Sequence, residues 1–261
     1  GDTIERGAFF DGFATFANYW GARASLFVSP GAFSDRLTRG GPLVRTPHSW
    51  SSDLSLNSDS RKNFFFEVYS HLEGDAAESY VRTLGVALTA RPSSNLTLSV
   101  EPSLSRSHDA TAYVDAFDDA GAPDTYGRRY VFGELEQRSF ELGTRADWTL
   151  TPHLSFQLYL QPFIAAGDYH DYRSLAAART RDYDRFTGNV ANPDFNFRSV
   201  RGSAVVRWEF RPGSALYVVW NENRSDVVRV GDFRFNRDLR AISTAPSHDV
   251  LLVKLSYWLP M

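Results

Sequence analysis

The chain has 261 residues, a formal net charge of −3 and no cysteine. This composition excludes thiol nucleophiles, disulfides and thiolate metal sites, and it leaves no basic footprint for nucleic acid. Aromatic residues make up 15% of the chain although its mean hydropathy is only −0.34, a combination that suits strands with one apolar and one polar face. No run of about eighteen apolar residues occurs, so a transmembrane helix is not expected.

Alternation of apolar and polar residues predicts about eleven β-strands along the chain. In chain order they are residues 8–20, 24–29, 50–57, 63–72, 80–91, 96–106, 128–150, 154–166, 196–210, 215–223 and 249–259. Segment 128–150 is long for one membrane strand, and we interpret its first half as a hairpin arm standing above the bilayer. The pattern predicts an all-β, antiparallel, up-and-down transmembrane β-barrel that occupies residues 1–261 as one domain.

The connections between these strands alternate in length. The short ones are residues 21–23, 58–62, 92–95, 151–153 and 211–214, and the others are 30–49, 73–79, 107–127, 167–193 and 225–248. Outer-membrane barrels have short periplasmic turns and long extracellular loops, so the alternation predicts a periplasmic C-terminus. The same count places Gly1 on the outer side with an odd number of strands, and we therefore expect at least one upstream strand to be missing.

The alternation also predicts which face meets lipid. A charge at the lipid midplane costs roughly 2–4 kcal/mol, so the charged positions of the strands should face inward. Arg106 is an exception, because it shares a face with Leu98 and Leu104, and we place it at the outer rim where its strand ends. The predicted lumen-lining residues are Glu67, Glu101, Glu141, Arg145, Asp147, Arg201, Arg207, Glu209 and Lys254.

The outer loops hold two sets of candidate ligand-binding residues. Arg36 and Arg39 flank the Gly40-Gly41 pair and would face an anionic ligand if the loop folded inward, although bracing of the loop against the barrel is the favoured interpretation. Tyr169 and Tyr172 would stack on a glycan or form part of an aromatic girdle.

Two further clusters have weaker chemical interpretations. His170 beside Asp168 and Asp171 offers an acid/base pair for a rim enzyme, but no second dyad or oxyanion site accompanies it, so an enzyme is not expected. The acidic loop tip with Asp115, Asp118, Asp119 and Asp124 departs from calcium-loop spacing. We therefore predict no metal and no cofactor.

Several short sequence motifs carry a family resemblance. They are Asn-Tyr-Trp at 18–20, Asp-Arg-Leu-Thr-Arg-Gly-Gly-Pro at 35–42, Asp-Ser-Arg-Lys at 59–62, Leu-Tyr-Leu-Gln-Pro-Phe at 158–163, Arg-Trp-Glu-Phe-Arg-Pro-Gly-Ser at 207–214 and Val-Lys-Leu-Ser-Tyr-Trp-Leu at 253–259. Together they resemble the C-terminal region of the bacterial family called domain of unknown function 5916. The resemblance implies an outer-membrane β-barrel that follows a module similar to family-nine carbohydrate-binding domains, and it implies no settled activity.

Four functions remain open at this stage. The favoured one is a porin-like channel, transport or translocation barrel in the bacterial outer membrane, whose inward charges set its selectivity. The alternatives are a plugged barrel that anchors or docks a carbohydrate-binding module or partner proteins, a rim-located hydrolase, and a soluble β-sandwich or closed barrel. The expected partners are outer-membrane lipid, a protein at the extracellular loops or periplasmic face, and a glycan.

Overall fold

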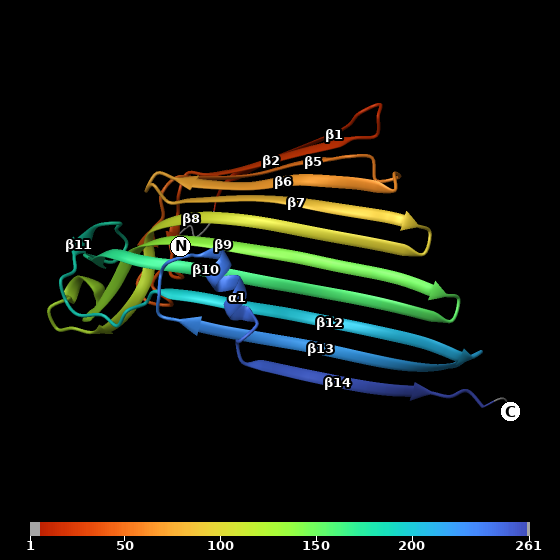
Figure 1. Cartoon of the computed structure of the whole chain (residues 1–261). Coiled ribbons are helices and arrows are strands. Elements are labelled where there is room, and N and C mark those ends of the chain that lie inside the picture. The colour runs from red at the N-terminus through yellow and green to blue at the C-terminus, as the bar shows by residue number, and fades with distance from the viewer. Residues whose placement is uncertain (1–5, 260–261) are drawn as a thin grey trace.

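The computed structural model describes residues 6–259, which form one long antiparallel sheet (Figure 1). The main strands of this sheet pair in chain order, interrupted only by short strands in the connections, so the order is that of an up-and-down sheet. The prediction of an all-β, up-and-down antiparallel fold is therefore confirmed. The strands of this path are β1 (Ala8–Thr15), β2 (Gly21–Ser29), β5 (Ser49–Asn57), β6 (Phe64–Asp75), β7 (Tyr80–Ser93), β8 (Leu96–Asp118), β9 (Arg128–Thr151), β10 (Leu154–Leu175), β12 (Phe195–Arg211), β13 (Ser214–Val228) and β14 (Ser247–Ser256).

The remaining elements lie in the long connections. β3 (Phe33–Ser34) and β4 (Val44–Arg45) form a separate two-stranded sheet, and β11 (Tyr183–Arg185) pairs with the end of β10. A 3-10 turn, η1 (Pro123–Thr125), lies between β8 and β9, and helix α1 (Phe235–Ile242) lies between β13 and β14. Among residues 6–259, no helix has the length and apolar character that crossing a bilayer requires. Within the same residues β1 and β14 do not pair with each other, so the sheet forms an open wall.

The largest differences from the predicted strands occur in β8 and β10. Both run well past their predicted ends at residues 106 and 166, and their ends pair with the first half of β9. The alternation fails there because β-bulges shift the register between Asp109 and Ala112 in β8 and between His170 and Arg173 in β10. The loops expected at 107–127 and 167–193 are correspondingly shorter. Figure 1 shows the three strand ends projecting beyond the rest of the sheet, and we call them the arm.

The first turn is also displaced from its predicted position. The chain turns at residues 16–20 rather than 21–23, with Phe16 N donating to Trp20 O at 2.8 Å. Tyr19 adopts a left-handed conformation with φ 63°, and Asn18 Oδ1 accepts a hydrogen bond from Trp20 N at 3.2 Å. The aromatic residues of this segment concealed the turn. Asparagine is a turn signal that hydropathy alone does not register, and the left-handed conformation of Tyr19 is visible only in the structure.

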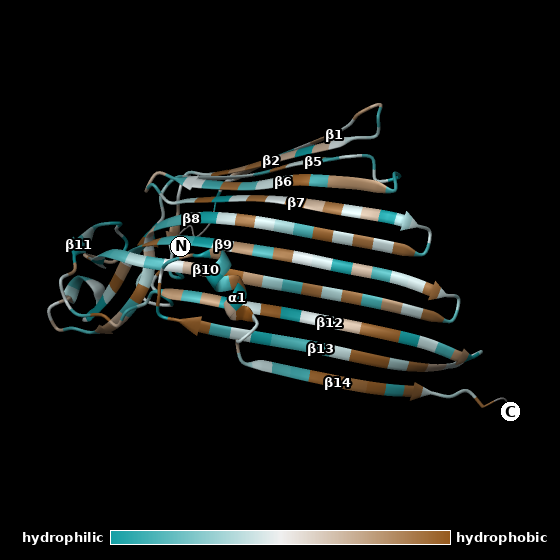
Figure 2. Cartoon of the chain, viewed as in Figure 1, coloured by the Kyte–Doolittle hydropathy of each residue, from teal (hydrophilic) through white to brown (hydrophobic). Residues whose placement is uncertain are grey.

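The register sorts the strand residues onto two faces. Leu54, Ser70, Leu84, Leu104 and Phe140 are successive cross-strand partners from β5 to β9. This apolar face is exposed, since Leu84 and Leu104 retain 56% and 57% of their accessible surface. The opposite face carries the polar and charged residues, and the alternation appears as teal and brown bands along each strand in Figure 2. An exposed apolar band is what a wall in contact with lipid requires.

Two small buried clusters hold the connections onto the sheet. Val44 of the β2–β5 connection packs with Tyr130, Phe132 and Leu175 of the arm. Helix α1 packs onto the apolar face through Ile242, which contacts the cluster of Ile164 and Val200. In Figure 1 the helix accordingly lies against β10 and β12. Residues 225–248, predicted as a long loop, thus contain the end of β13, a docked helix and the start of β14.

Candidate functional sites

The nine charged residues predicted to line a lumen all lie on the polar face of the sheet. Their cross-strand partners place them there: Glu141, for example, stands between Ser103 and Phe163, and Arg207 stands between Ser155 and Tyr217. That this face borders a lumen stays a prediction. The residues are Glu67, Glu101 and Glu141, then Arg145, Asp147 and Arg201, then Arg207, Glu209 and Lys254.

A hydrogen-bonded cluster occupies the middle of the polar face. Tyr69 Oη donates to Glu101 Oε1 at 3.0 Å, and Tyr159 Oη donates to Gln161 Oε1 at 2.7 Å. Gln161 Nε2 in turn donates to Glu141, and the Arg145 guanidinium lies 5.2 Å from the centre of the Tyr159 ring. These side chains line a hollow of about 190 Å³. The cluster is a ready donor and acceptor surface for a polar solute.

Tyr69 belongs to this cluster, and the sequence did not single it out. Its ring lies across Gly85, the residue paired with it on β7, and a Cβ atom at Gly85 would come within 2.2 Å of Tyr69 Cζ. Glycine is therefore required at this position for the tyrosine to lie flat over the neighbouring strand. A glycine inside an alternating strand was the available signal.

Charged residues also pair at both ends of the polar face. Near the short turns, Arg207 Nη2 lies 2.9 Å from Glu209 Oε2, and its Nε donates to Tyr217 Oη at 3.3 Å. Near the long loops, His71 lies between Asp53 Oδ1 and Glu73 Oε1, at 2.7 Å and 2.8 Å. The histidine group escaped the sequence reasoning, although Asp53 and His71 fall on the polar positions of adjacent predicted strands.

The short turn at residues 58–62 is held by its own charges. Asp59 accepts hydrogen bonds from Arg61 Nε at 2.9 Å and from Arg61 N at 3.0 Å, and these bonds lower the pKa of Asp59 to about 2. The Arg61 guanidinium lies 3.2 Å from the centre of the Tyr19 ring in the preceding turn. Two of the motifs that carry the family resemblance, at residues 18–20 and 59–62, are thus in contact with each other.

The loop that carries Arg36 and Arg39 has the contacts of a brace. Thr38 is buried and its Oγ1 donates to Asp35 O at 3.0 Å and to Pro42 O at 2.8 Å. The Arg39 guanidinium lies 4.2 Å from the centre of the Tyr113 ring on the arm, and both Arg36 and Arg39 are exposed. A ligand at these arginines stays a prediction.

Tyr169 and Tyr172 lie on β10 at the bulge. Tyr169 N donates to Asp194 Oδ1 at 2.8 Å, and Tyr172 Oη donates to Tyr169 O at 3.4 Å. Burial raises the pKa of both phenols. Tyr172 lines a hollow of about 430 Å³ together with Tyr183 and Phe186. The two tyrosines are therefore parts of the packed arm, and glycan contact by them stays a prediction.

The histidine predicted as a candidate acid/base residue contacts one of its two expected partners, Asp171, and has Glu134 rather than Asp168 as its second. His170 Nδ1 lies 3.2 Å from Asp171 Oδ2 and 4.0 Å from Glu134 Oε2. Among residues 6–259, one group of three His, Asp or Glu residues has ligand atoms close enough together to share a metal ion, and it consists of Glu134, His170 and Asp171. Glu134 is also bound by the Arg173 guanidinium, which competes with an ion for this carboxylate.

The acidic loop tip does not gather its carboxylates. Asp119 is bound by the Arg129 side chain, whose Nε lies 2.6 Å from Oδ2, and by Gly121 N at 2.8 Å. These bonds lower the pKa of Asp119. Asp115 and Asp118 lie on β8, and Asp124 lies in η1. An arginine fills the place at Asp119 that a cation would take.

The fold is that of outer-membrane barrel proteins. The crystal structure of the siderophore receptor PiuA from Acinetobacter baumannii superposes with a TM-score of 0.52 and 8% identity, over 95% of this chain and 43% of that one. The copper transporter OprC superposes with a TM-score of 0.51 and 10% identity, over 95% of this chain and 41% of that one. The chain spans less than half of either protein, and at such identity the likeness concerns the fold alone.

The sequence assigns the family. The chain belongs to the family described as Domain of unknown function (DUF5916), whose model matches residues 6–261. This confirms the resemblance seen in the sequence motifs. No curated protein matches the chain in sequence.

Proposed function

We propose that the chain forms part of the wall of a transport barrel in the bacterial outer membrane. The observation that carries the proposal is the division of one sheet into an exposed apolar face and a charged, hydrogen-bonded face. A lipid-facing wall with a polar interior has this construction. The siderophore receptor and the copper transporter share the fold, which supports a transport-related role without indicating the solute.

The proposed orientation follows the lengths of the connections. The arm, α1 and the β3–β4 hairpin lie at the end of the sheet with the long connections, whereas the other end has tight turns (Figure 1). Barrels of this class have long loops outside the cell and short turns in the periplasm. The arm would therefore project from the cell surface. An N-terminal module that resembles a carbohydrate-binding domain would be tethered to this barrel.

The polar face is proposed to set selectivity. Cations at Arg145, Arg207 and Lys254 share it with carboxylates at Glu101, Glu141 and Glu209. Changing the three cations together to Gln removes positive charge and leaves the apolar face untouched. Ion preference should then shift toward cations.

The test uses the complete protein and its triple Gln variant in planar bilayers. A heat-modifiable protein that conducts in steps, with a reversal potential shifted in the variant, supports the proposal. An unchanged reversal potential would show that Arg145, Arg207 and Lys254 do not set ion selectivity. A silent but heat-modifiable protein would favour a plugged anchor over an open conduit, whereas a protein that neither inserts nor shows heat modifiability would refute the barrel itself.

A further inference from the structure

Three arginines form a row across neighbouring strands on the apolar face. Arg82 of β7 is paired with Arg106 of β8, and Arg106 is paired with Arg138 of β9. All three side chains are exposed. Like charges directly opposite one another in a sheet are destabilising, so such a row is unfavourable unless an anion lies against it.

The local counter-charges are too few to neutralise the row. Arg106 Nη2 lies 3.6 Å from Glu136 Oε2, and the same carboxylate also accepts from His108 Nδ1 at 3.0 Å. The Arg82 guanidinium lies over the Tyr80 ring at 4.7 Å. Among residues 6–259, neither Arg82 nor Arg138 makes an ion pair. The row therefore presents net positive charge to its surroundings.

On β7, β8 and β9 the row lies where the apolar band ends. Two residues along each strand, about 7 Å away, lie Leu84, Leu104 and Phe140 on the side of the short turns. On the side of the long loops the corresponding residues are Tyr80, His108 and Glu136. In the proposed orientation the row is at the level of lipid headgroups, a depth at which arginine side chains are tolerated and attract anionic lipids.

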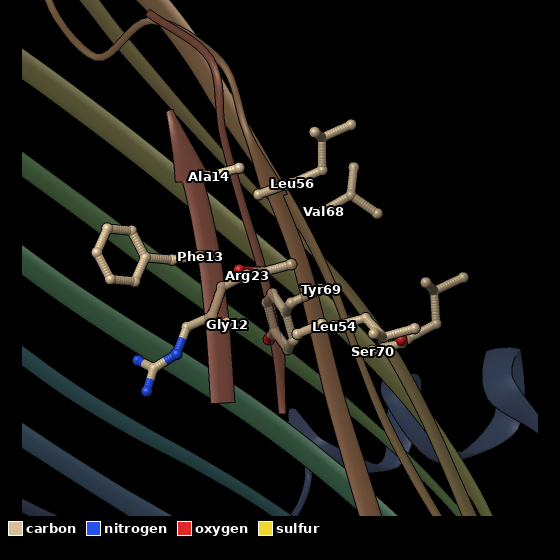
Figure 3. Close-up of a pocket in the computed structure, with 13 residues that line it drawn as sticks. Gly12, Phe13, Ala14, Arg23, Leu54, Leu56, Val68, Tyr69 and Ser70 are labelled. Carbon is tan, nitrogen blue, oxygen red and sulfur yellow. The ribbon is translucent and has the colours of Figure 1, made fainter. Parts of the chain in front are cut away.

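An apolar hollow of about 750 Å³ lies on the same face beside the row. The residues of β1 and β2 that face it are small, namely Gly12, Ala14, Ala22 and Ala24, and its walls include Leu54, Leu56, Val68 and Leu84. Figure 3 shows Leu56 and Val68 projecting on one side of the sheet and Phe13 and Arg23 on the other.

The hollow and the row meet at β7. Leu84 borders the hollow, and Arg82, two residues along the strand, begins the row. Across the sheet, Ala24, Leu54, Ser70 and Leu84 form one line of partners, so the hollow extends about 14 Å from β7 to β2. A lipid acyl chain spans that distance easily.

We propose that the row and the hollow together bind one anionic lipid of the outer leaflet, with its phosphate on Arg82, Arg106 and Arg138 and an acyl chain in the hollow. Guanidinium groups bind phosphate oxygens with paired, charge-assisted hydrogen bonds. The small residues lower the surface locally, so that a methylene chain in the hollow contacts its apolar walls as well as its floor. The inference rests on the proposed outer-membrane location, and it adds a specific lipid site to the wall.

The first test is native mass spectrometry of the complete protein in detergent, with dioleoyl phosphatidylglycerol and dioleoyl phosphatidylcholine as probes. Phosphatidylglycerol should bind more tightly, and the R82Q/R106Q/R138Q variant should lose roughly tenfold to one hundredfold of that affinity. The control variant R128Q/R185Q/R229Q changes three exposed arginines elsewhere and should retain it. Equal binding of the two lipids, or an unaffected triple variant, would overturn the proposal.

Two further experiments identify what is bound. An A22L/A24L variant fills the hollow while keeping the arginines, and it should weaken phosphatidylglycerol binding without abolishing the preference for the anionic headgroup. Inorganic phosphate should not displace the lipid, and displacement would instead indicate a small-anion site. Heat modifiability and conductance are measured on the same samples: a conducting barrel without lipid preference contradicts only this inference, whereas a protein that forms no barrel contradicts the proposed function.

Discussion

The wall and the arm of this molecule are built from the same strands and are stabilised in different ways. In the wall the register shifts only beside the short turns, and one face is apolar and exposed, with Leu104 at 57% exposure. In the arm, β-bulges interrupt the alternation and connecting segments pack onto it, so that Phe132 of β9 is 0% exposed. In the proposed barrel the wall would depend on lipid for its apolar contacts, whereas the arm has a buried core of its own.

The sharpest way to test this contrast is to truncate one apolar side chain in each region. Phe132→Ala should cost about 3–5 kcal/mol of stability, because it leaves a cavity among Val44, Tyr130 and Leu175. Leu104→Ala should cost less, about 1–2 kcal/mol, because lipid refills the space and no cavity remains. The two stability costs are measured by urea unfolding of the complete protein in lipid vesicles, and hydrogen exchange reports on the arm. Equal costs would show that the arm has no core separate from the wall.

A second comparison contrasts the two faces of the wall within one strand. Val100 and Ser99 are neighbours on β8, and the alternation puts them on the apolar and polar faces respectively. Val100→Arg should destabilise the barrel by roughly 2–4 kcal/mol, whereas Ser99→Arg should change its stability by less than about 1 kcal/mol. Unfolding free energies in vesicles give the two values. If Ser99→Arg proved the more damaging substitution, the assignment of faces to lipid and lumen would be reversed.

Local alternation was enough to predict the wall, and it was not enough to predict what lies against it. The side-chain period of a strand is two residues, so the faces of Glu101, Glu141 and Arg207 follow from their immediate neighbours. The bulges depend instead on pairing between strands. So does the row of arginines, since Arg106 was placed at the outer rim by its position alone, while Arg82 and Arg138 beside it emerge only from the register.

Docking of α1 lay further out of reach of the sequence. The contact between Asn196 and Asp238 joins residues 42 positions apart, and no periodicity reports it. The clue was a chemical one, a helix with both Asp238 and Ile242 on its buried side, which needs a polar partner as well as an apolar one. Asn196 of β12 supplies that partner, at the end of the wall where the long connections lie.

The pH dependence of α1 docking gives the smallest expected effect and examines the place where a connection meets the wall. Asp238 is fully buried, and burial by itself raises the pKa of its carboxyl. Hydrogen bonds from Arg237, from the backbone of Arg234 and from Asn196 outweigh burial, so the pKa lies below its ordinary value. The ionised carboxylate therefore stabilises docking at pH values above the ordinary pKa of an aspartate, which is about 4. This stabilisation is lost as the pH falls through the lowered pKa of Asp238.

Hydrogen exchange of residues 229–246 in the folded barrel tests this directly. Protection should hold from neutral pH down to about pH 4 and fall below it, while the Asp238→Asn variant should lose roughly 1–3 kcal/mol of protection at neutral pH together with the acid transition. Asp249→Asn, which changes an exposed carboxylate on β14, is the matched control and should behave like the unchanged protein. An acid transition that persisted in Asp238→Asn would assign the loss to another carboxylate, with Asp232 next in line because Arg237 binds it at 2.8 Å. Because Ile242 does not titrate, the pH profile separates the charged contacts of the helix from its apolar burial against the wall.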